Sequence, residues 1–353
     1  MKKLLLGFLS ISFLSAGLSY SSVAKAEEKE LVIGAILPLT GKASEMGQEM
    51  KKGALLAKDY WKKEKKSNIN IIIEDSKSLP KDGVSAYMKL KSNNVNLFTT
   101  TLSSVCLALL PKVDEDNILL FADAAHPKIT EKFNPRVFRN SSTSESEAKE
   151  IFKSLVNKNS KIIDIIYLNS DYGVSFLNHI KNISGSKIKI NEISFNEDTI
   201  NYKNLALKIN KNSDSVVIVG IGKSIGNLIK SIKLQGFSGN IYANIGYILT
   251  GGRESAGNLR KGVLYTQMKV NPLGISEWAN KQYKKMYNKK ITADALLEFN
   301  SISLIKLASQ KTNLEPNQIS KNMTKSVKEL FGTNKLNSKG DILADVEVVK
   351  EVN

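Results

Sequence analysis

Apolar and polar residues follow two alternating patterns along the chain. Short runs such as residues 31–37, 118–124 and 215–220 are almost continuously apolar and rich in β-branched side chains, which is typical of strands that are covered on both faces. Stretches such as residues 46–61 place their apolar side chains on one helical face. Because strands that alternate with helices favour parallel sheets, the sequence predicts an α/β fold.

The alternation continues to about residue 270 and then changes. Two long helical patterns follow, and a strand pattern ends the chain. This order fits a chain that crosses between two α/β lobes more than once. The helix at 104–113 is expected to end in a breaker region. The predicted strands are 31–37, 69–75, 96–101, 118–124, 161–168, 188–195, 215–220, 240–244, 262–270 and 342–352, and the predicted helices are 46–61, 84–91, 104–113, 150–156, 172–180, 202–209, 224–235, 276–287 and 293–309.

The first 26 residues have the pattern of a signal peptide. Lys2 and Lys3 precede an apolar stretch at residues 4–18, and Ala24-Lys25-Ala26 fits a signal peptidase site. The alternative is an uncleaved membrane anchor, but the apolar stretch is shorter than the roughly 20 residues that a spanning helix needs. We therefore expect an exported protein that is cleaved near Ala26 and is not inserted in a membrane afterwards. The remaining length suggests two domains.

The charge of the chain suggests a polyanion as a partner, but the residue types argue against one. The formal net charge is +17, and it is still +14 without Lys2, Lys3 and Lys25. Arginine is the preferred reader of phosphates and bases, and only four occur, at 136, 139, 253 and 260. Scattered lysines account for the rest, so we expect a solvated lysine-rich surface and no nucleic-acid partner, with a polyanion site as the alternative.

Few side chains are available for catalysis or metal binding. Cys106 is the only cysteine, and His126 and His179 are the only histidines. Cys106 lies in an apolar helical stretch, where a buried and unreactive thiol is expected. We therefore expect no metal site, no cofactor and no enzymatic activity.

A glycine-rich turn at residues 216–229, VVIVGIGKSIGNLI, resembles a phosphate-binding loop at first sight. A Walker loop would need glycine at position 217, where Val217 stands. The dinucleotide pattern fails as well, because Gly226 comes one position late after Gly220 and Gly222. We therefore predict a plain strand-to-helix turn. Ligands bind outside the carboxyl ends of parallel strands, so the position of this turn could still place it at a ligand site.

Four segments carry a resemblance to a known family. Residues 31–61 contain Pro38, Thr40-Gly41, Gly47 and a small-residue GALLA stretch, and residues 99–130 contain a serine-rich turn, a helix, a strand and a small-residue loop. Residues 169–176 and 336–352 add weaker matches. Together they resemble the type I periplasmic binding proteins of the leucine-binding type, which are solute receptors of ABC uptake systems.

The resemblance implies two Rossmann-like lobes with parallel sheets, joined by a multi-strand hinge. It places the first lobe at 27–143 and 272–338, and the second lobe at 144–271 and 339–353. A small solute would be trapped between the lobes and delivered unaltered to a membrane ABC permease. The alternative is a periplasmic sensor or accessory protein with the same fold and a degenerate cleft.

The resemblance also assigns ligand contacts in the first lobe. Ser103 and Ser104 precede a helix, whose unpaired N–H groups and partial positive charge suit a carboxylate. Simple capping of that helix is the alternative. The backbone carbonyl at Ala124 and Ala125 would accept a hydrogen bond from an ammonium group. His126 stands where relatives commonly have threonine, and it is either a contact to the ligand or a surface histidine.

The second lobe matches the family less well. Tyr172 matches the aromatic residue that closes over the ligand, with packing as the alternative. Ile245 stands where amino-acid receptors have a carboxylate, which puts an ordinary amino acid in doubt because a buried ammonium group needs a counter-charge. Lys223 would favour an anionic or neutral ligand, unless it is only a solvated loop lysine. The expected solute is an amino acid or a related small polar or anionic molecule.

Overall fold

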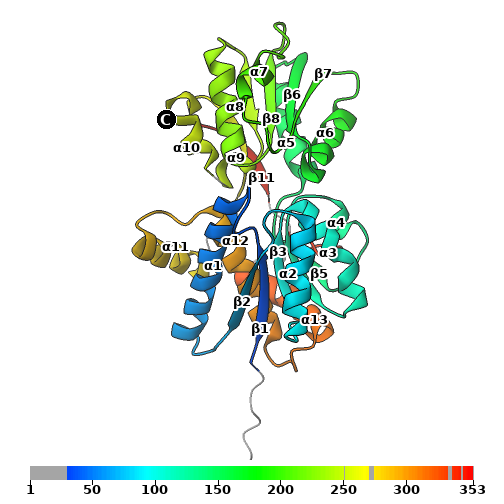
Figure 1. The fold of residues 1–353 in the computed structure, drawn as a ribbon, viewed down its shortest axis with the longest axis vertical. Helices are drawn as coiled ribbons and strands as arrows, with labels where there is room; N and C mark the ends of the chain where they lie inside the picture. Colours follow the sequence, from blue (N-terminus) through cyan, green and yellow to red (C-terminus); the bar gives the residue numbers. More distant parts are fainter. Residues whose placement is uncertain (1–29, 250, 270–273, 333–335, 343–344, 353) are drawn as a thin grey trace, which may run out of the picture.

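The computed structural model describes residues 30–249, 251–269, 274–332, 336–342 and 345–352. Two α/β lobes are stacked along the long axis of the molecule (Figure 1), and each lobe is built on its own sheet of mostly parallel strands. The prediction of an α/β protein with two lobes is therefore confirmed. The predicted signal peptide, residues 1–26, lies outside the described residues.

The first lobe contains a sheet of five parallel strands in the order β2-β1-β3-β4-β5. Successive residues of a strand point to opposite faces, and in β4 Phe121 packs with one hydrophobic core while Leu120 packs with another. Helices α1, α11, α12 and α13 cover the first face, and α2 and α3 cover the second. The strands are β1 (Val32–Leu37), β2 (Asn70–Asp75), β3 (Leu97–Thr101), β4 (Leu119–Asp123) and β5 (Val137–Phe138), and the helices are α1 (Ser44–Lys63), α2 (Pro80–Ser92), α3 (Ser103–Glu115), α4 (Lys128–Glu131), α11 (Gly274–Tyr287), α12 (Ala293–Ser309) and α13 (Pro316–Phe331).

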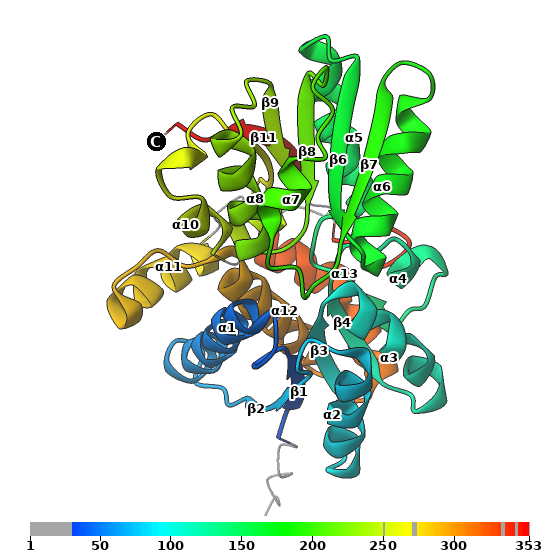
Figure 2. The ribbon, with the colours of Figure 1, turned by 45° about the horizontal axis from the view of Figure 1, so that its top comes forward.

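The second lobe contains a six-stranded sheet in the order β11-β10-β9-β8-β6-β7. Only β11 is antiparallel to its neighbour, β10. Helices α5 and α6 cover one face, and α7, α8 and α10 cover the other (Figure 2). The elements are α5 (Ser144–Asn157), β6 (Ile162–Leu168), α6 (Asp171–Ser184), β7 (Lys189–Phe195), α7 (Tyr202–Ala206), β8 (Ser215–Val219), α8 (Lys223–Leu234), β9 (Asn240–Ala243), α9 (Gly246–Leu249), α10 (Gly252–Ala256), the 3-10 helix η1 (Gly257–Arg260), β10 (Leu264–Met268) and β11 (Val346–Lys350).

The chain passes between the lobes three times: after β5, after β10 and before β11. The first and third passages run side by side, because the Arg139 N–H donates to the Gly340 carbonyl at 3.0 Å and the Ile342 N–H donates to the Arg139 carbonyl at 2.8 Å. The buried Arg139 guanidinium also pairs with Asp341 at 2.7 Å. These contacts tie together two of the three connections on which any relative movement of the lobes depends.

The structure differs from the predicted elements in two instructive places. Helix α13 was not predicted, although Ile319, Met323 and Val327 recur at helical spacing on its buried face; its many lysines and polar residues hide that pattern. Helix α3 includes Pro111 and ends at Glu115, two residues beyond the predicted end. Pro111 has no N–H to donate to the Leu107 carbonyl, and both residues lie on a side of the helix that is not fully buried. Water can therefore replace the missing hydrogen bond.

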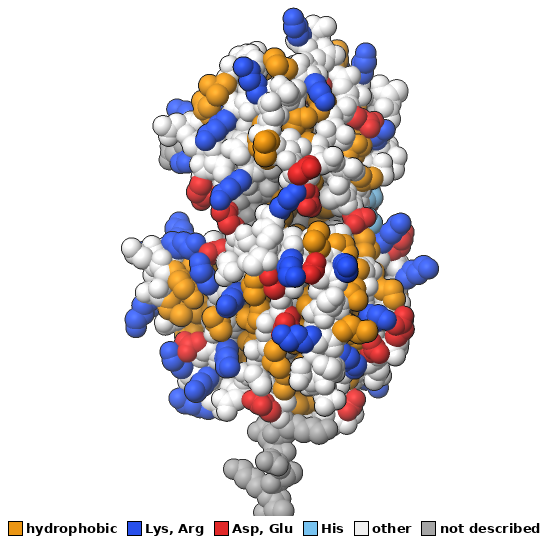
Figure 3. Space-filling model, in the orientation of Figure 1, with side chains coloured by type: hydrophobic (Ala, Val, Ile, Leu, Met, Phe, Trp, Pro, Cys, Tyr) orange, Lys and Arg blue, Asp and Glu red, His pale blue; other side chains and the backbone are white. Residues whose placement is uncertain are grey.

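Positively charged side chains are scattered over the face of the molecule that Figure 3 shows. Lys and Arg side chains lie over both lobes and are mixed with Asp and Glu on the face shown in Figure 3. In the part of the chain that the structure describes, no helix combines the length and apolar character needed to cross a bilayer.

Candidate ligand-binding site

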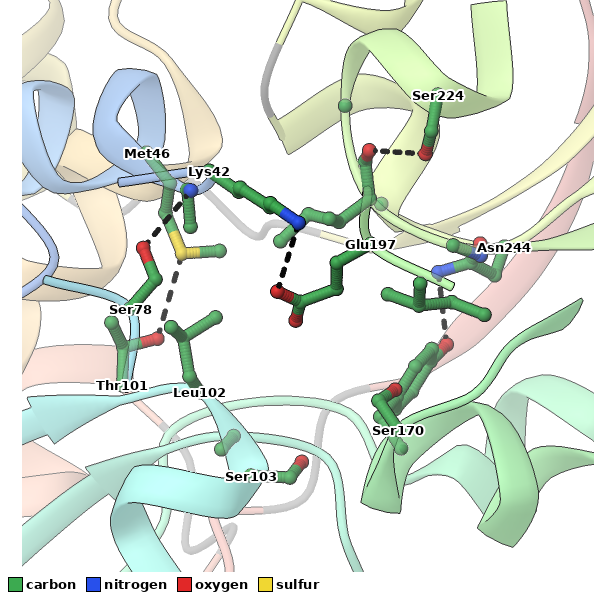
Figure 4. A pocket seen from close by; sticks show the side chains of 18 of the residues that line it. Lys42, Met46, Ser78, Thr101, Leu102, Ser103, Ser170, Glu197, Ser224 and Asn244 are labelled. Atoms are coloured by element: carbon green, nitrogen blue, oxygen red, sulfur yellow. Dashed lines mark hydrogen bonds and ion pairs between the residues drawn. The ribbon is translucent and has the colours of Figure 1, made fainter. Parts of the chain in front are cut away.

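A cavity of about 490 Å³ lies between the two lobes. It is bounded by the loops that follow β3 and β4 in the first lobe, by those that follow β6 to β9 in the second lobe, and by the first turns of α1 and α12 (Figure 4). It therefore lies at the carboxyl ends of strands from both sheets, where α/β proteins bind ligands. Its volume is within the range of small-molecule sites.

Ser103 and Ser104 both line the cavity at the start of α3. The N-cap residue of α3 is Leu102, with φ of 68° and no side-chain cap, so neither serine caps the helix. Within the described chain, neither serine hydroxyl has a hydrogen-bond partner. The arrangement leaves the first N–H groups of α3 and two hydroxyls available at the cavity wall. Their contact with a ligand stays a prediction.

The loop after β4 brings two of its three predicted residues to the cavity. Ala124 and Ala125 line it, but His126 is not among the lining residues. His126 Nδ1 accepts a hydrogen bond from the Lys128 N–H at 3.2 Å, in the first turn of α4. Burial is the main cause that lowers the pKa of His126. The Ala125 carbonyl already accepts from the Ser144 N–H at 2.9 Å.

Tyr172 lines the cavity with its ring but uses its hydroxyl within the second lobe. The hydroxyl donates to Glu147 at 3.1 Å and accepts from the Asn244 side chain at 3.0 Å. Burial, followed by the charge of Glu147, raises the pKa of Tyr172. The hydroxyl of Tyr172 is therefore already hydrogen-bonded within the second lobe, which leaves the aromatic ring for contact with a ligand.

Ile245 also lines the cavity, and its backbone N–H contacts a buried acid, Glu147, that no sequence pattern had singled out. The Ile245 N–H donates to Glu147 Oε2 at 2.9 Å, and Thr266 Oγ1 donates to the same oxygen at 2.9 Å. Ser142 and Tyr172 donate to the other oxygen. Burial raises the pKa of Glu147, and these four donors oppose the shift. Glu147 does not line the cavity and acts by positioning the residues around it.

The glycine-rich turn is a strand-to-helix connection between β8 and α8, and it lines the cavity. Gly222 has φ of 58°, a conformation that favours glycine. At Gly226, an added Cβ would lie 2.3 Å from the Gly252 carbonyl oxygen, so glycine permits close packing of α8 on α10. Both glycines are thus explained by the backbone, without a nucleotide.

Two ion pairs cross the mouth of the cavity from lobe to lobe. Lys223 of the turn pairs with Glu45 of α1, so the lysine is not simply solvated. Lys42 pairs with Glu197 at 3.9 Å, and Figure 4 shows the lysine reaching across to it. All four side chains are 44% or more exposed, so each pair contributes little stability by itself.

The lining carries more acidic than basic side chains, although the chain as a whole is strongly basic. Besides the two paired lysines, six acidic residues line the cavity: Glu45, Asp123, Asp171, Glu197, Asp198 and Asp294. Asp123 ends β4 and is 5% exposed, and Asp294 lies in the first turn of α12 and is 1% exposed. Sequence reasoning missed both of these buried carboxylates. The position of Asp123 at a strand end was the one available signal.

The cysteine and histidine side chains that could have suggested catalysis or metal binding do not line the cavity. Cys106 is fully buried, and burial raises the pKa of its thiol. No group of three or more His, Cys, Asp or Glu residues in the described ranges is arranged to hold a metal ion. The cavity lining itself consists of polar, charged and apolar side chains, among them Ser104, Asp294 and Met46.

Comparisons with known proteins agree with this architecture. A sequence model of the family described as periplasmic binding protein matches residues 30–340. The Leu/Ile/Val-binding protein homolog 3 of Brucella melitensis is 25% identical over 266 residues, which cover 71% of this chain and 71% of that protein.

Two solved structures have a similar fold. A leucine-binding protein, LivK, from Thermotoga maritima has a TM-score of 0.78 at 18% identity and covers 92% of this chain and 96% of its own. The branched-chain amino acid transporter substrate-binding protein LivJ from Streptococcus pneumoniae, in complex with isoleucine, has a TM-score of 0.79 at 18% identity and covers 92% of this chain and 100% of its own. These relatives are named as binding proteins and not as enzymes. The family match spans most of the chain, and so the chain belongs to the periplasmic binding protein family, as the resemblance to its leucine-binding type predicted.

Proposed function

We propose that the protein is the periplasmic solute receptor of an ABC uptake system. It binds a small solute between its two lobes and delivers it unaltered to a membrane permease. The observation that carries the proposal is the cavity at the carboxyl ends of both sheets, in a chain of this family. Export by the predicted signal peptide and the permease partner are parts of the same proposal.

Binding would proceed by closure of the lobes. The solute would meet the open N-terminus of α3 and the Ala124–Ala125 loop in the first lobe. The Tyr172 ring and the turn around Lys223 would then complete the enclosure from the second lobe. A solute shifts the equilibrium toward the closed form only as far as it binds that form more tightly.

We also propose the lobe boundaries that the resemblance implies, with the first lobe at 27–143 and 272–338. Packing of Ile342 in the core of the first lobe favours moving the last boundary from 339 to just beyond that residue. The hinge would then consist of the segments that leave β5, leave β10 and enter β11.

A thermal-shift screen tests the receptor function. The panel contains aliphatic and charged amino acids, amides, small carboxylates and nucleotides. A solute at a hundredfold excess over its Kd stabilises the protein by about 2.7 kcal/mol, which is a rise of a few degrees in Tm for a chain of this size. The absence of a shift with every compound would favour the alternative, a sensor or accessory protein with a degenerate cleft.

Substitution of Ser104 tests the site. Ser104→Ala removes one unpartnered hydroxyl at the cavity wall, so we expect affinity for the solute to fall about fivefold, from the loss of one hydrogen bond. Ser85→Ala, on the exposed face of α2, is the control and should bind as the unaltered protein does. Equal affinity of both variants, measured by titration calorimetry, would remove Ser104 from the site.

A further inference from the structure

A buried carboxylate with no counter-charge lies at the cavity, in the first turn of α12. Asp294 lines the cavity and is 1% exposed. Across the described residues, no side chain donates a hydrogen bond to it, no lysine or arginine pairs with it, and its Oδ2 is fully buried. Burial of an unpaired carboxylate is costly, so a group that supplies positive charge here would be bound favourably.

Lysines of α1 and of the segment before α12 pair with another acid, Glu49. Glu49 of α1 is the charged group that acts on Asp294. Glu49 accepts from Lys52 at 2.5 Å and from Lys289 at 3.0 Å, and these bonds contribute to lowering its pKa to about 2. Burial and the negative charge of Glu49 instead raise the pKa of Asp294 well above its usual range. Among the described residues, Glu49 therefore has cationic partners and Asp294 has none.

A second carboxylate of the same lobe is only half satisfied. Asp123 lines the cavity and is 5% exposed. Its Oδ2 accepts from Ser301 at 2.8 Å, while its Oδ1 has no partner. Ser301 lies two helical turns after Asp294 on α12, which corresponds to about 10 Å along the helix axis. The first lobe thus presents two under-satisfied carboxylates to one cavity.

The lysines at the cavity do not supply the missing charge. Lys42 and Lys223 pair with Glu197 and Glu45 at the mouth. The other acidic lining residues, Asp123, Asp171, Asp198 and Asp294, have no ion pair with a lysine or arginine among the described residues. Asp171 and Asp198 are exposed, so the buried acids of the lining are Asp123 and Asp294, in a chain of net charge +17.

Apolar side chains beside Asp294 complete the picture of the ligand. Met46 and Met50 of α1 line the cavity. Helix α1 packs closely on α12, since an added Cβ on Gly53 would lie 2.0 Å from the Ala295 carbonyl oxygen. Leu102 and Leu297 also line the cavity. An apolar body could pack here while a polar group reaches the carboxylate.

We propose that the cavity takes a solute with a cationic nitrogen, as an amine, amidinium or guanidinium, on an apolar body, and that Asp294 is its counter-charge. Asp123 is the second acceptor. The inference rests on the proposed receptor function and names the class of its solute. It replaces the expectation, drawn from Lys223 alone, of an anionic or neutral ligand, and it puts the acidic anchor in the first lobe instead of at Ile245.

Titration calorimetry with matched pairs of compounds tests the inference. Hexylamine is compared with 1-hexanol, and hexanamidine with hexanamide, because the members of each pair share the apolar chain and differ in the cationic nitrogen. We expect at least one cation to bind about tenfold or more tightly than its neutral partner, because it pairs with a buried charge. Asp294→Asn, which keeps the shape of the side chain, should abolish that preference.

Control variants separate a binding role from a structural one. Glu298→Gln removes a buried carboxylate one turn further along α12 that does not line the cavity, and it should keep the preference for the cation. Asp123→Asn should reduce the preference without abolishing it. The Tm of each variant verifies that it is folded before its affinity is compared.

The possible results separate the two proposals. Equal binding of a cation and its neutral partner, or an unchanged preference in Asp294→Asn, would overturn the cationic class and leave the receptor function standing. Failure of every cation to bind, while a neutral or anionic solute of the wider panel binds, would have the same meaning. Failure of the entire panel would contradict the receptor function as well.

Discussion

At the scale of single residues, the first lobe is unusual in the acids that it buries. Asp123, Asp294 and Glu298 are each less than 6% exposed, and each has a carboxyl oxygen without a partner. The sequence did not show that these acids are buried. Asp294 and Glu298 lie within one helical pattern, residues 293–309, and the packing of α12 on α1 decides which side of that helix faces the cavity. The family resemblance pointed to the serines of α3 and to Tyr172, which line the cavity, and their contact with a ligand stays a prediction.

Glu298 gives a prediction for the pH dependence of stability. Burial raises its pKa from 4.5 to about 7. Below pH 4.5 the carboxyl is protonated in both states; from there to about pH 7 the unfolded chain ionises it while the folded chain keeps the proton. The free energy of unfolding should therefore fall as pH rises through this window, by about 3 kcal/mol from this group.

Urea unfolding at pH 4.5 and pH 7.5 measures the effect. Asp123 and Asp294 also have raised pKa values because of burial, so the unaltered protein should lose stability over this range from more than one group. In Glu298→Gln the loss should be smaller by about 3 kcal/mol. The same loss in both proteins would show that Glu298 ionises in the folded chain as readily as in the unfolded one.

At the scale of elements, the apolar pattern was a good guide to strands and long helices and a poor guide to what lies between them. Strand β4 and helix α12 lie where the pattern placed them. Helix α13 was hidden by its polar residues, and the short helices α9 and α10 are too short to carry a period. Close approaches of elements were not visible either, because they depend on residues far apart in the sequence.

The close approach of α1 and α12 gives a prediction at this scale. Gly53→Ala raises the intrinsic helix propensity by about 1 kcal/mol, but its Cβ would lie 2.0 Å from the Ala295 carbonyl oxygen. We expect a net loss of about 1–3 kcal/mol in the free energy of unfolding, because the helices must move apart. Lys58→Ala, on the exposed face of α1, is the control and should change stability little. A stabilised Gly53→Ala variant in the same urea titration would contradict the packing described here.

At the scale of the whole molecule, the lobes meet outside the hinge through ion pairs and through Ile221 of the second lobe, which packs against Met46 and Met50 of the first. The two ion pairs that cross the mouth, Lys42–Glu197 and Glu45–Lys223, are largely exposed and are screened by salt. A solute that contacts both lobes would add to these contacts and favour the closed form by its differential affinity for it.

The central claim, that the lobes close on a solute, is tested most directly by small-angle X-ray scattering. The protein is measured with and without the solute that gives the largest thermal shift. The account predicts that the saturated protein is the more compact, with a smaller radius of gyration and a profile that matches the two-lobed structure. The solute should be recovered unchanged after the measurement. If the scattering profile with the solute bound were identical to the profile without it, closure on the ligand would be contradicted. Conversion of the solute to another compound would contradict a receptor that releases its ligand unaltered.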